Sequence, residues 1–170
     1  DNLNVLLWND DDELTKNLDY VLTVLDIKDY ESYKKSVGLS DSNSENIESW
    51  QILSPVKQKE SSGTLSLNTY LQNKFLKNTL EKWRAANPFS KYTPKPFGKS
   101  KDIVHEDKVI QNINTSSLYC YPKNSQKYVA NGEIGLVKFY DKKPRQIKVE
   151  FSTQPGFLYH YSNGEGKQSV

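Results

Sequence analysis

Gln146-Ile147-Lys148-Val149-Glu150-Phe151 alternates polar and apolar side chains with a period of two residues. Such alternation indicates a β-strand that buries one face and exposes the other. Turn sequences at Asn131-Gly132 and at residues 141–144 lie nearby. Further strand candidates in the same half of the chain are residues 108–114, 118–121, 134–140 and 157–161. Short strands so close together predict a small β-barrel, because a flat sheet of this size would leave its edges exposed.

The predicted barrel spans residues 107–165, and we expect its strands to bury a core of their own. That core is expected to contain Val109, Ile134, Val137, Ile147, Val149 and Phe151. Residues 87–106 precede the barrel and contain three prolines and four lysines. This composition predicts an irregular connection between the barrel and what comes before it.

Before this connection the apolar pattern has the period of a helix. Apolar residues 3–8 predict a buried strand, and Asp10 followed by Glu13 has the spacing of a helix capping box. A shorter, weaker helix is predicted over residues 30–36. The apolar side of the first helix consists of Leu14, Leu18, Val21, Leu22 and Leu25.

A second strand is predicted at residues 50–53, and a long helix is predicted to run from Ser66 to Asn87. Strand, helix, strand and helix in this order are typical of a parallel α/β sheet. We therefore expect a mixed α/β chain. It would hold a partial parallel-sheet domain over residues 1–100 and the inserted barrel after it.

Two pairs of short motifs resemble those of a known family. The first pair is Trp50-Gln51-Ile52-Leu53-Ser54-Pro55-Val56-Lys57 and Leu67-Asn68-Thr69-Tyr70-Leu71-Gln72. The second pair is Asp107-Lys108-Val109-Ile110-Gln111 and Asn131-Gly132-Glu133-Ile134-Gly135. The first resembles the strand, loop and helix that open the second RecA-like motor domain of superfamily 1, RecD-like (UvrD-like) DNA helicases. The second is similar to the motifs that frame an SH3-like barrel inserted in that domain.

This resemblance implies that the chain contributes the second motor domain of an ATP-dependent DNA helicase. It implies ATP and Mg²⁺ as cofactors of the intact parent, and no cofactor in this part alone. The implied partners are DNA, single-stranded rather than duplex, and the first motor domain of the same protein, in the cytoplasm. The chain begins at Asp1 and contains no Met, so we expect it to be part of a longer protein.

The resemblance also suggests residues that contact ligands. Lys57 is the candidate for nucleotide contact, at a place where relatives often carry an arginine; a lysine there is a point charge rather than a planar fork. Apart from the resemblance, Lys99 and Lys101 belong to a stretch at residues 91–101 that interleaves lysines with aromatic rings, which suits single strands through stacking, or else forms a poorly ordered loop. The full set of nucleic-acid candidates is Ser54, Asn68, Gln72, Lys99, Lys101, Lys108 and Asn131.

Each of these candidates also has a structural alternative. Ser54 and the proline after it can simply end a strand. Asn68 and Gln72 lie one helical turn apart and can equally form a solvated helix face. Asn131-Gly132 is first of all the sequence of a hairpin turn.

The charge of the chain is divided unequally. Residues 1–60 hold 13 Asp and Glu against 6 Lys, a net charge of −7, whereas residues 61–170 carry +9. A basic half favours a phosphate backbone as its ligand, although two solvated faces of opposite charge would give the same count.

Several classes of site are excluded by the sequence itself. No G-x-x-x-x-G-K-[ST] phosphate loop occurs, the two histidines lack zinc-like spacing, and Cys120 has no second cysteine to pair with. No apolar run approaches the ~20 residues of a membrane span. The sequence therefore predicts no catalytic residues and no metal site here. The alternative function is a non-catalytic SH3-like interaction module that binds protein or nucleic acid.

Overall fold

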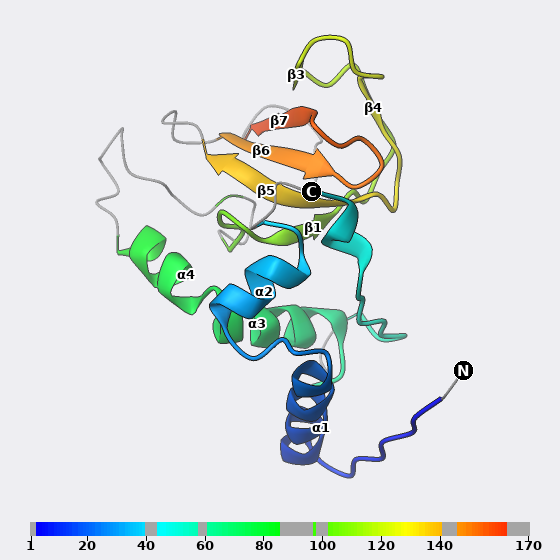
Figure 1. The fold of residues 1–170 in the computed structure, drawn as a ribbon, viewed down its shortest axis with the longest axis vertical. Helices are drawn as coiled ribbons and strands as arrows, with labels where there is room; N and C mark the ends of the chain where they lie inside the picture. The colour runs from blue at the N-terminus through cyan, green and yellow to red at the C-terminus, as the bar shows by residue number, and fades with distance from the viewer. Residues whose placement is uncertain are drawn as a thin grey trace.

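The computed structural model of the chain describes residues 3–39, 44–57, 61–85, 97, 102–140 and 146–162. Helices occupy the first half of the chain and antiparallel strands the second, so the fold is of the mixed α and β class (Figure 1). All strand pairs in the described residues are antiparallel, and no parallel sheet is formed among them. None of the described helices has the length and apolar composition that crossing a membrane requires.

Helix α1 (Asp11–Val24) begins at the predicted N-cap, where the Asp10 side chain accepts a hydrogen bond from the Glu13 N–H. The reciprocal half of the predicted capping box is shifted by one residue. The Glu13 carboxylate accepts from the N–H of Asn9, at 2.8 Å, rather than from that of Asp10. The helix start is therefore satisfied on both sides, as a helix N-terminus requires.

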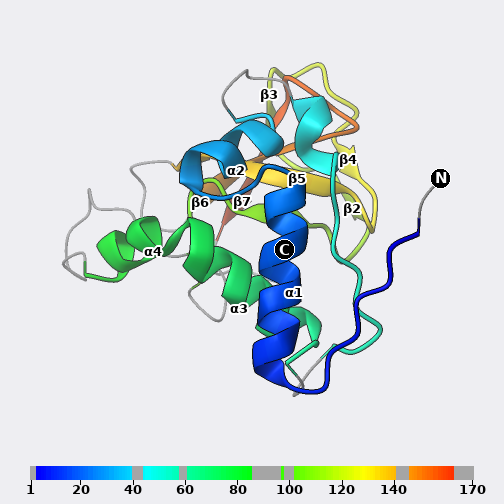
Figure 2. The same ribbon diagram turned by 60° about the horizontal axis from the view of Figure 1, so that its bottom comes forward.

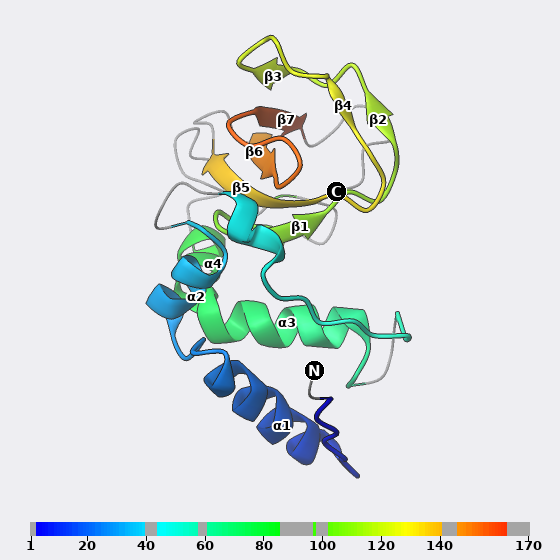
Figure 3. The same ribbon diagram turned by 45° about the vertical axis from the view of Figure 1, so that its right-hand side comes forward.

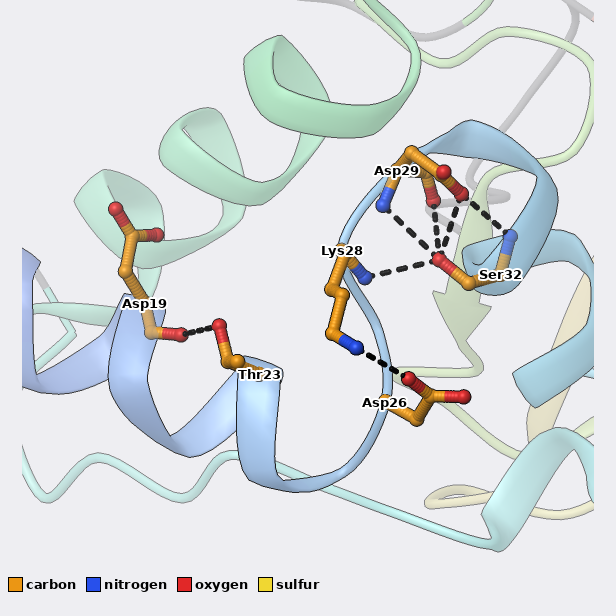
Figure 4. A network of polar contacts seen from close by, with 6 residues as sticks. All are labelled: Asp19, Thr23, Asp26, Lys28, Asp29 and Ser32. Carbon is orange, nitrogen blue, oxygen red and sulfur yellow. Dashed lines mark hydrogen bonds and ion pairs between the residues drawn. The ribbon is translucent and has the colours of Figure 1, made fainter.

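Helix α2 (Tyr30–Ser36) has the predicted bounds, because a complete capping box fixes its start. The Asp29 carboxylate accepts from the Ser32 N–H, and the Ser32 hydroxyl accepts from the Asp29 N–H (Figure 4). In the preceding turn, Lys28 Nζ lies 2.7 Å from Asp26 Oδ1. A short 3₁₀ helix, η1 (Ser44–Glu48), follows α2.

The long helix predicted from Ser66 to Asn87 is in fact two helices, α3 (Thr64–Phe75) and α4 (Lys77–Arg84). The break lies at Leu76, whose backbone leaves the helical region with φ −116° and ψ 11°. Leu76 is only 2% exposed, next to the buried Phe75 at the end of α3. The bend lets the apolar sides of both helices enter one core, which a straight helix would not allow.

The strand-rich half of the chain, which we call the barrel after its prediction, consists of strands β1 (Lys108–Ile110), β2 (Thr115–Ser116), β3 (Cys120–Tyr121), β4 (Tyr128–Val129), β5 (Ile134–Tyr140), β6 (Gln146–Phe151) and β7 (Leu158–Ser162). Five of them form a sheet in the order β1-β5-β6-β7-β3, and β2 pairs with β4 as a separate ribbon. Among the described residues no pairing joins the edge strands β1 and β3, so the main sheet is not closed. In Figure 3 the ribbon lies at the edge of the curved sheet. Each residue range predicted as a strand in this half includes an observed strand. Strands β1 and β3 are shorter than predicted.

Two hydrophobic cores lie on opposite faces of β5. Val137 faces the barrel core, whereas Leu136 faces a second core beneath the helices. Ile134 packs against the helical core too, so its prediction as a barrel-core residue is wrong. Side chains alternate along a strand, and a strand covered on both faces serves two cores. The other five predicted core residues lie in the barrel core, as expected: Val109, Val137, Ile147, Val149 and Phe151.

The strands predicted at residues 3–8 and 50–53 are not formed. Both segments are irregular, without a strand partner among the described residues. In Figure 2 both segments descend beside α1 toward its N-terminal end. Their apolar composition is that of buried strands, but a parallel strand needs neighbours and cover on both faces. The described residues provide neither, and Leu7 and Leu53 are 85% and 87% exposed.

Candidate functional site at the junction of helices and barrel

The two motif pairs that resemble the helicase family meet at one buried junction. Gln72, on α3, donates from Nε2 to Asp107 Oδ2 at 2.8 Å and to the Asp102 carbonyl at 2.6 Å. The same Asp107 oxygen accepts from the Val104 N–H at 2.7 Å. Gln72 belongs to the first pair and Asp107 opens the second. Their contact joins the helices to the start of the barrel.

Burial dominates the electrostatics of Asp107. It raises the pKa of this carboxyl from its ordinary value of 3.8 to about 7, and the hydrogen bonds from Val104 and Gln72 offset only part of the effect. Asp102 nearby raises the pKa further by like-charge repulsion. The junction therefore contains an acid that titrates near neutral pH.

Lys108 forms a second link across the same junction. Its ammonium donates to the Trp50 carbonyl at 2.7 Å and lies 4.9 Å from the centroid of the Trp50 ring. The Trp50 indole N–H in turn donates to the Ser36 hydroxyl. Burial lowers the pKa of Lys108 to about 8, and the charge of Glu48 opposes this shift. Lys108 points inward, so its place in the fold favours a structural role over contact with DNA.

Replacing Lys108 by glutamate is expected to lower the free energy of unfolding by about 3 kcal/mol. A carboxylate there would face the Trp50 carbonyl and the negative face of its ring, with no donor in return. Lys108→Met keeps the apolar stem and is expected to cost less. Lys123→Glu, at an exposed lysine of the barrel, is the control, with a change within about 0.5 kcal/mol. Urea unfolding measures all three, and equal losses for the two glutamate variants would contradict the link to Trp50.

Gln111 joins the two motifs of the second pair inside the barrel. It is 1% exposed; its Nε2 donates to the Ile113 carbonyl and to Thr115 Oγ1, both at 2.7 Å, and its Oε1 accepts from the Tyr161 hydroxyl. Its backbone pairs with the other motif, because the Gln111 carbonyl accepts from the Gly132 N–H at 2.8 Å. All its side-chain polar atoms are thus satisfied within the core, as buried amides require.

The glycines of that motif have backbone roles. Gly132 has φ +94°, a conformation that side chains disfavour, and it follows the exposed Asn131 in the turn. The Asn131 N–H donates to Asn114 Oδ1 at 2.8 Å, which fixes the turn against β2. Gly135 lies in β5 opposite Phe151 of β6, where a Cβ would be 2.7 Å from a methyl of Val149. Asn131 therefore lies in a turn between β4 and β5, but these two strands do not pair with each other, so the hairpin predicted there is not formed.

The remaining candidate residues are dispersed. The Ser54 hydroxyl accepts from the Val56 N–H and donates to the Ser62 carbonyl at 2.7 Å, which shapes the loop before α3. Lys57 and Asn68 are exposed, on that loop and on α3. Lys99 and Lys101 lie outside the described residues, as does most of the predicted connection at residues 87–106. Of the candidates that the structure describes, only Gln72 and Lys108 come together at the junction.

An apolar groove along α1 was not predicted from the sequence. It encloses about 320 Å³ between the helix and the two irregular segments at residues 3–8 and 50–53. Val21, Leu25 and Ile52 line it and are 42%, 49% and 37% exposed. Sequence spacing predicts burial for all three, because it fits a core-facing helix and a buried strand. Exposed apolar surface of this kind is typical of sites that contact protein, ligand or membrane.

No metal centre accompanies these features: across the described ranges, no three His, Cys, Asp or Glu side chains group as metal ligands. The functional interpretation therefore depends on the junction, the groove and the barrel surface. A scan of protein-family models gave no match, and comparisons with curated proteins and with solved structures found no similar protein.

Proposed function

We propose that this chain contributes the second motor domain of a superfamily 1, RecD-like DNA helicase, with its SH3-like barrel lying against single-stranded DNA. The observation that carries the proposal is the contact between the two motif pairs. They are separate in the sequence, and they meet through Gln72 and Asp107, 35 residues apart, at 2.8 Å. A second contact, from Lys108 to the Trp50 carbonyl, joins the same two pairs. Motifs that specify one structural unit are expected to touch in this way.

The unpaired segments support the α/β part of the proposal. Residues 3–8, helix α1 and residues 50–53 follow one another in the order predicted for strand, helix and strand, and both segments lie beside α1 (Figure 2). In an α/β sheet, a connection of this order joins two parallel strands. In the proposal, these segments become strands when the rest of the motor domain pairs with them and covers the groove along α1.

The catalytic chemistry belongs to the intact parent. Transfer of a phosphoryl group depends on positioning and charge shared across a cleft. ATP and Mg²⁺ would be held by the first motor domain, with Lys57 reaching the nucleotide from this side. Lys57 is exposed on the loop that precedes α3, so it is able to face such a cleft.

The 170-residue chain alone is expected to bind no ATP and to hydrolyse none, because it lacks the phosphate loop. Isothermal calorimetry with Mg·ATP and a phosphate-release assay check this directly. A stoichiometric heat of binding, or turnover above a buffer blank, would contradict the assignment to the second motor domain.

The same proposal is tested on the coding sequence around the chain. A G-x-x-x-x-G-K-[ST] motif upstream, and ATPase activity of the longer product that rises with single-stranded DNA, are the expected results. Lys57→Ala in that product should lower the rate, whereas Lys82→Ala, at an exposed lysine of α4, should not. An open reading frame with no phosphate loop would leave the interaction module as the better account.

A further inference from the structure

The end of the barrel farthest from α1 presents three exposed tyrosines within a short stretch of chain. Tyr119, Tyr121 and Tyr128 are 59%, 65% and 41% exposed. Cys120, between the first two, is 3% exposed and points into the barrel core. Strand alternation therefore turns Tyr119 and Tyr121 outward together. We call these three residues the tyrosine face; Tyr121 lies in β3, Tyr119 directly before it and Tyr128 in β4, and both strands lie at the top of Figure 1, opposite α1.

Each tyrosine is held by the backbone around it. The Tyr119 carbonyl accepts from the His160 N–H at 2.9 Å, and its ring meets the His160 ring edge to face at 4.7 Å. Tyr121 pairs with Leu158 across β3 and β7. Tyr128 pairs with Ser116 across β4 and β2. Ordered backbone at all three positions, and the ring contact of Tyr119, reduce the freedom that is lost on binding, which favours affinity.

The sequence around the tyrosine face is basic up to Glu133, whose carboxylate accepts a hydrogen bond from Thr153. Residues 108–132 contain three lysines and no Asp or Glu. Lys123 and Lys127, both exposed, lie between Tyr121 and Tyr128 in the chain. Neither forms an ion pair with any of the described residues. Flat aromatic surface beside uncompensated cations complements a ligand that offers unpaired bases and phosphates.

We propose that the tyrosine face binds single-stranded nucleic acid, with bases stacked on the tyrosine rings and phosphates beside Lys123 and Lys127. Stacking requires the flat face of a base, which a duplex hides and a single strand exposes. A protein partner would complement the rings equally well, but it would not require cations free of carboxylates. The inference deepens the proposed function, because it names the surface of the barrel that meets DNA, yet it does not depend on ATP chemistry.

Fluorescence anisotropy of a labelled oligo-dT, titrated with the whole chain over a salt series, tests the tyrosine face. Changing Tyr119, Tyr121 and Tyr128 together to alanine is expected to weaken binding at least about tenfold, because each lost stack costs that order of affinity. The triple phenylalanine variant keeps the rings and should bind within about threefold of the original chain. Tyr20→Ala, at a 60% exposed tyrosine of α1, is the matched control and should change nothing.

The lysines are tested separately through the salt dependence. Lys123→Gln with Lys127→Gln should reduce the slope of log affinity against log salt by roughly one to two, since each phosphate that a lysine no longer neutralises lowers it by about one. The alanine variants should leave that slope unchanged. Urea unfolding checks that each variant is folded. If the triple alanine variant is unfolded, a triple leucine variant, which keeps apolar volume without rings, takes its place.

The possible results separate the two proposals. Binding that is undetectable at low salt, or equal for the alanine and phenylalanine variants, overturns the tyrosine face. Capture of oligo-dT that depends on the rings supports it even if the coding sequence holds no phosphate loop, in which case only the helicase assignment fails. Conversely, the longer product can hydrolyse ATP while oligo-dT binding does not depend on the tyrosine rings. In that case the tyrosine-face proposal fails and the helicase proposal stands.

Discussion

Replacing Gly135 by alanine is expected to lower the free energy of unfolding by about 3 kcal/mol. The added Cβ would lie 2.7 Å from Val149 Cγ1, 2.8 Å from the Glu150 carbonyl oxygen and 2.9 Å from Phe151 Cδ1. The carbonyl belongs to β6, which pairs with β5 at this point, so it cannot move away without disturbing the sheet. Urea unfolding should show a lower midpoint at an unchanged slope.

Gly132→Ala is the matched control for this substitution. Gly132 lies three residues earlier, and nothing is within 4 Å of the position of its Cβ. Its φ of +94° makes alanine strained there, at about 1 kcal/mol, without any clash. If both alanine variants lose the same stability, backbone conformation rather than close packing explains the glycines of this motif.

The titration of Asp107 is expected to lower the free energy of unfolding as pH rises from about 4 to about 7. The pKa of Asp107 is raised by burial to about 7, whereas its ordinary value is 3.8. In this window the unfolded chain has released the proton and the native chain still holds it. Stability therefore falls as pH rises, and the full loss is reached above the native pKa. A shift of this size corresponds to a few kcal/mol, roughly.

Asp107→Asn removes this titration and isolates it from the other carboxyls. The amide oxygen of asparagine can still accept from Val104 and Gln72, which both donate to one oxygen of Asp107. We expect the variant to gain stability relative to the original chain as pH rises from 4.5 to 7.5. Urea unfolding at several pH values gives the difference, with Asp26→Asn, at an exposed aspartate, as the control. A difference that stays constant across this range would show that Asp107 does not titrate there.

Local patterns predicted the elements that are stabilised locally. The bounds of α2 follow from its capping box, and β5 and β6 follow from period-two alternation and nearby turns. The break at Leu76 was missed because the apolar spacing continues across it, and only the shared core requires the bend. The strands at residues 3–8 and 50–53 were predicted from composition alone. Composition does not supply the neighbouring strands on which a parallel sheet depends.

The candidate site was predictable in part. The motifs selected Gln72 and Lys108 as candidates for nucleic-acid contact, which stays a prediction; the partners that they have in the structure lie 35 and 58 residues away in sequence. A spacing rule cannot distinguish an amide that faces DNA from one that faces a buried carboxylate. The groove along α1 was hidden for the opposite reason, since exposed and buried apolar faces have the same periodicity.

Strand β5 has a consequence for how the molecule responds to force. Two consecutive residues of β5 lie in different cores: Leu136 in the core under the helices and Val137 in the core of the barrel. A slip of one residue in its register would exchange the two faces and disrupt both cores at once. The strand is therefore locked from both sides, and the barrel has no hinge at β5 about which to swing. We therefore expect the barrel and the helices to move together when a force acts on the barrel surface.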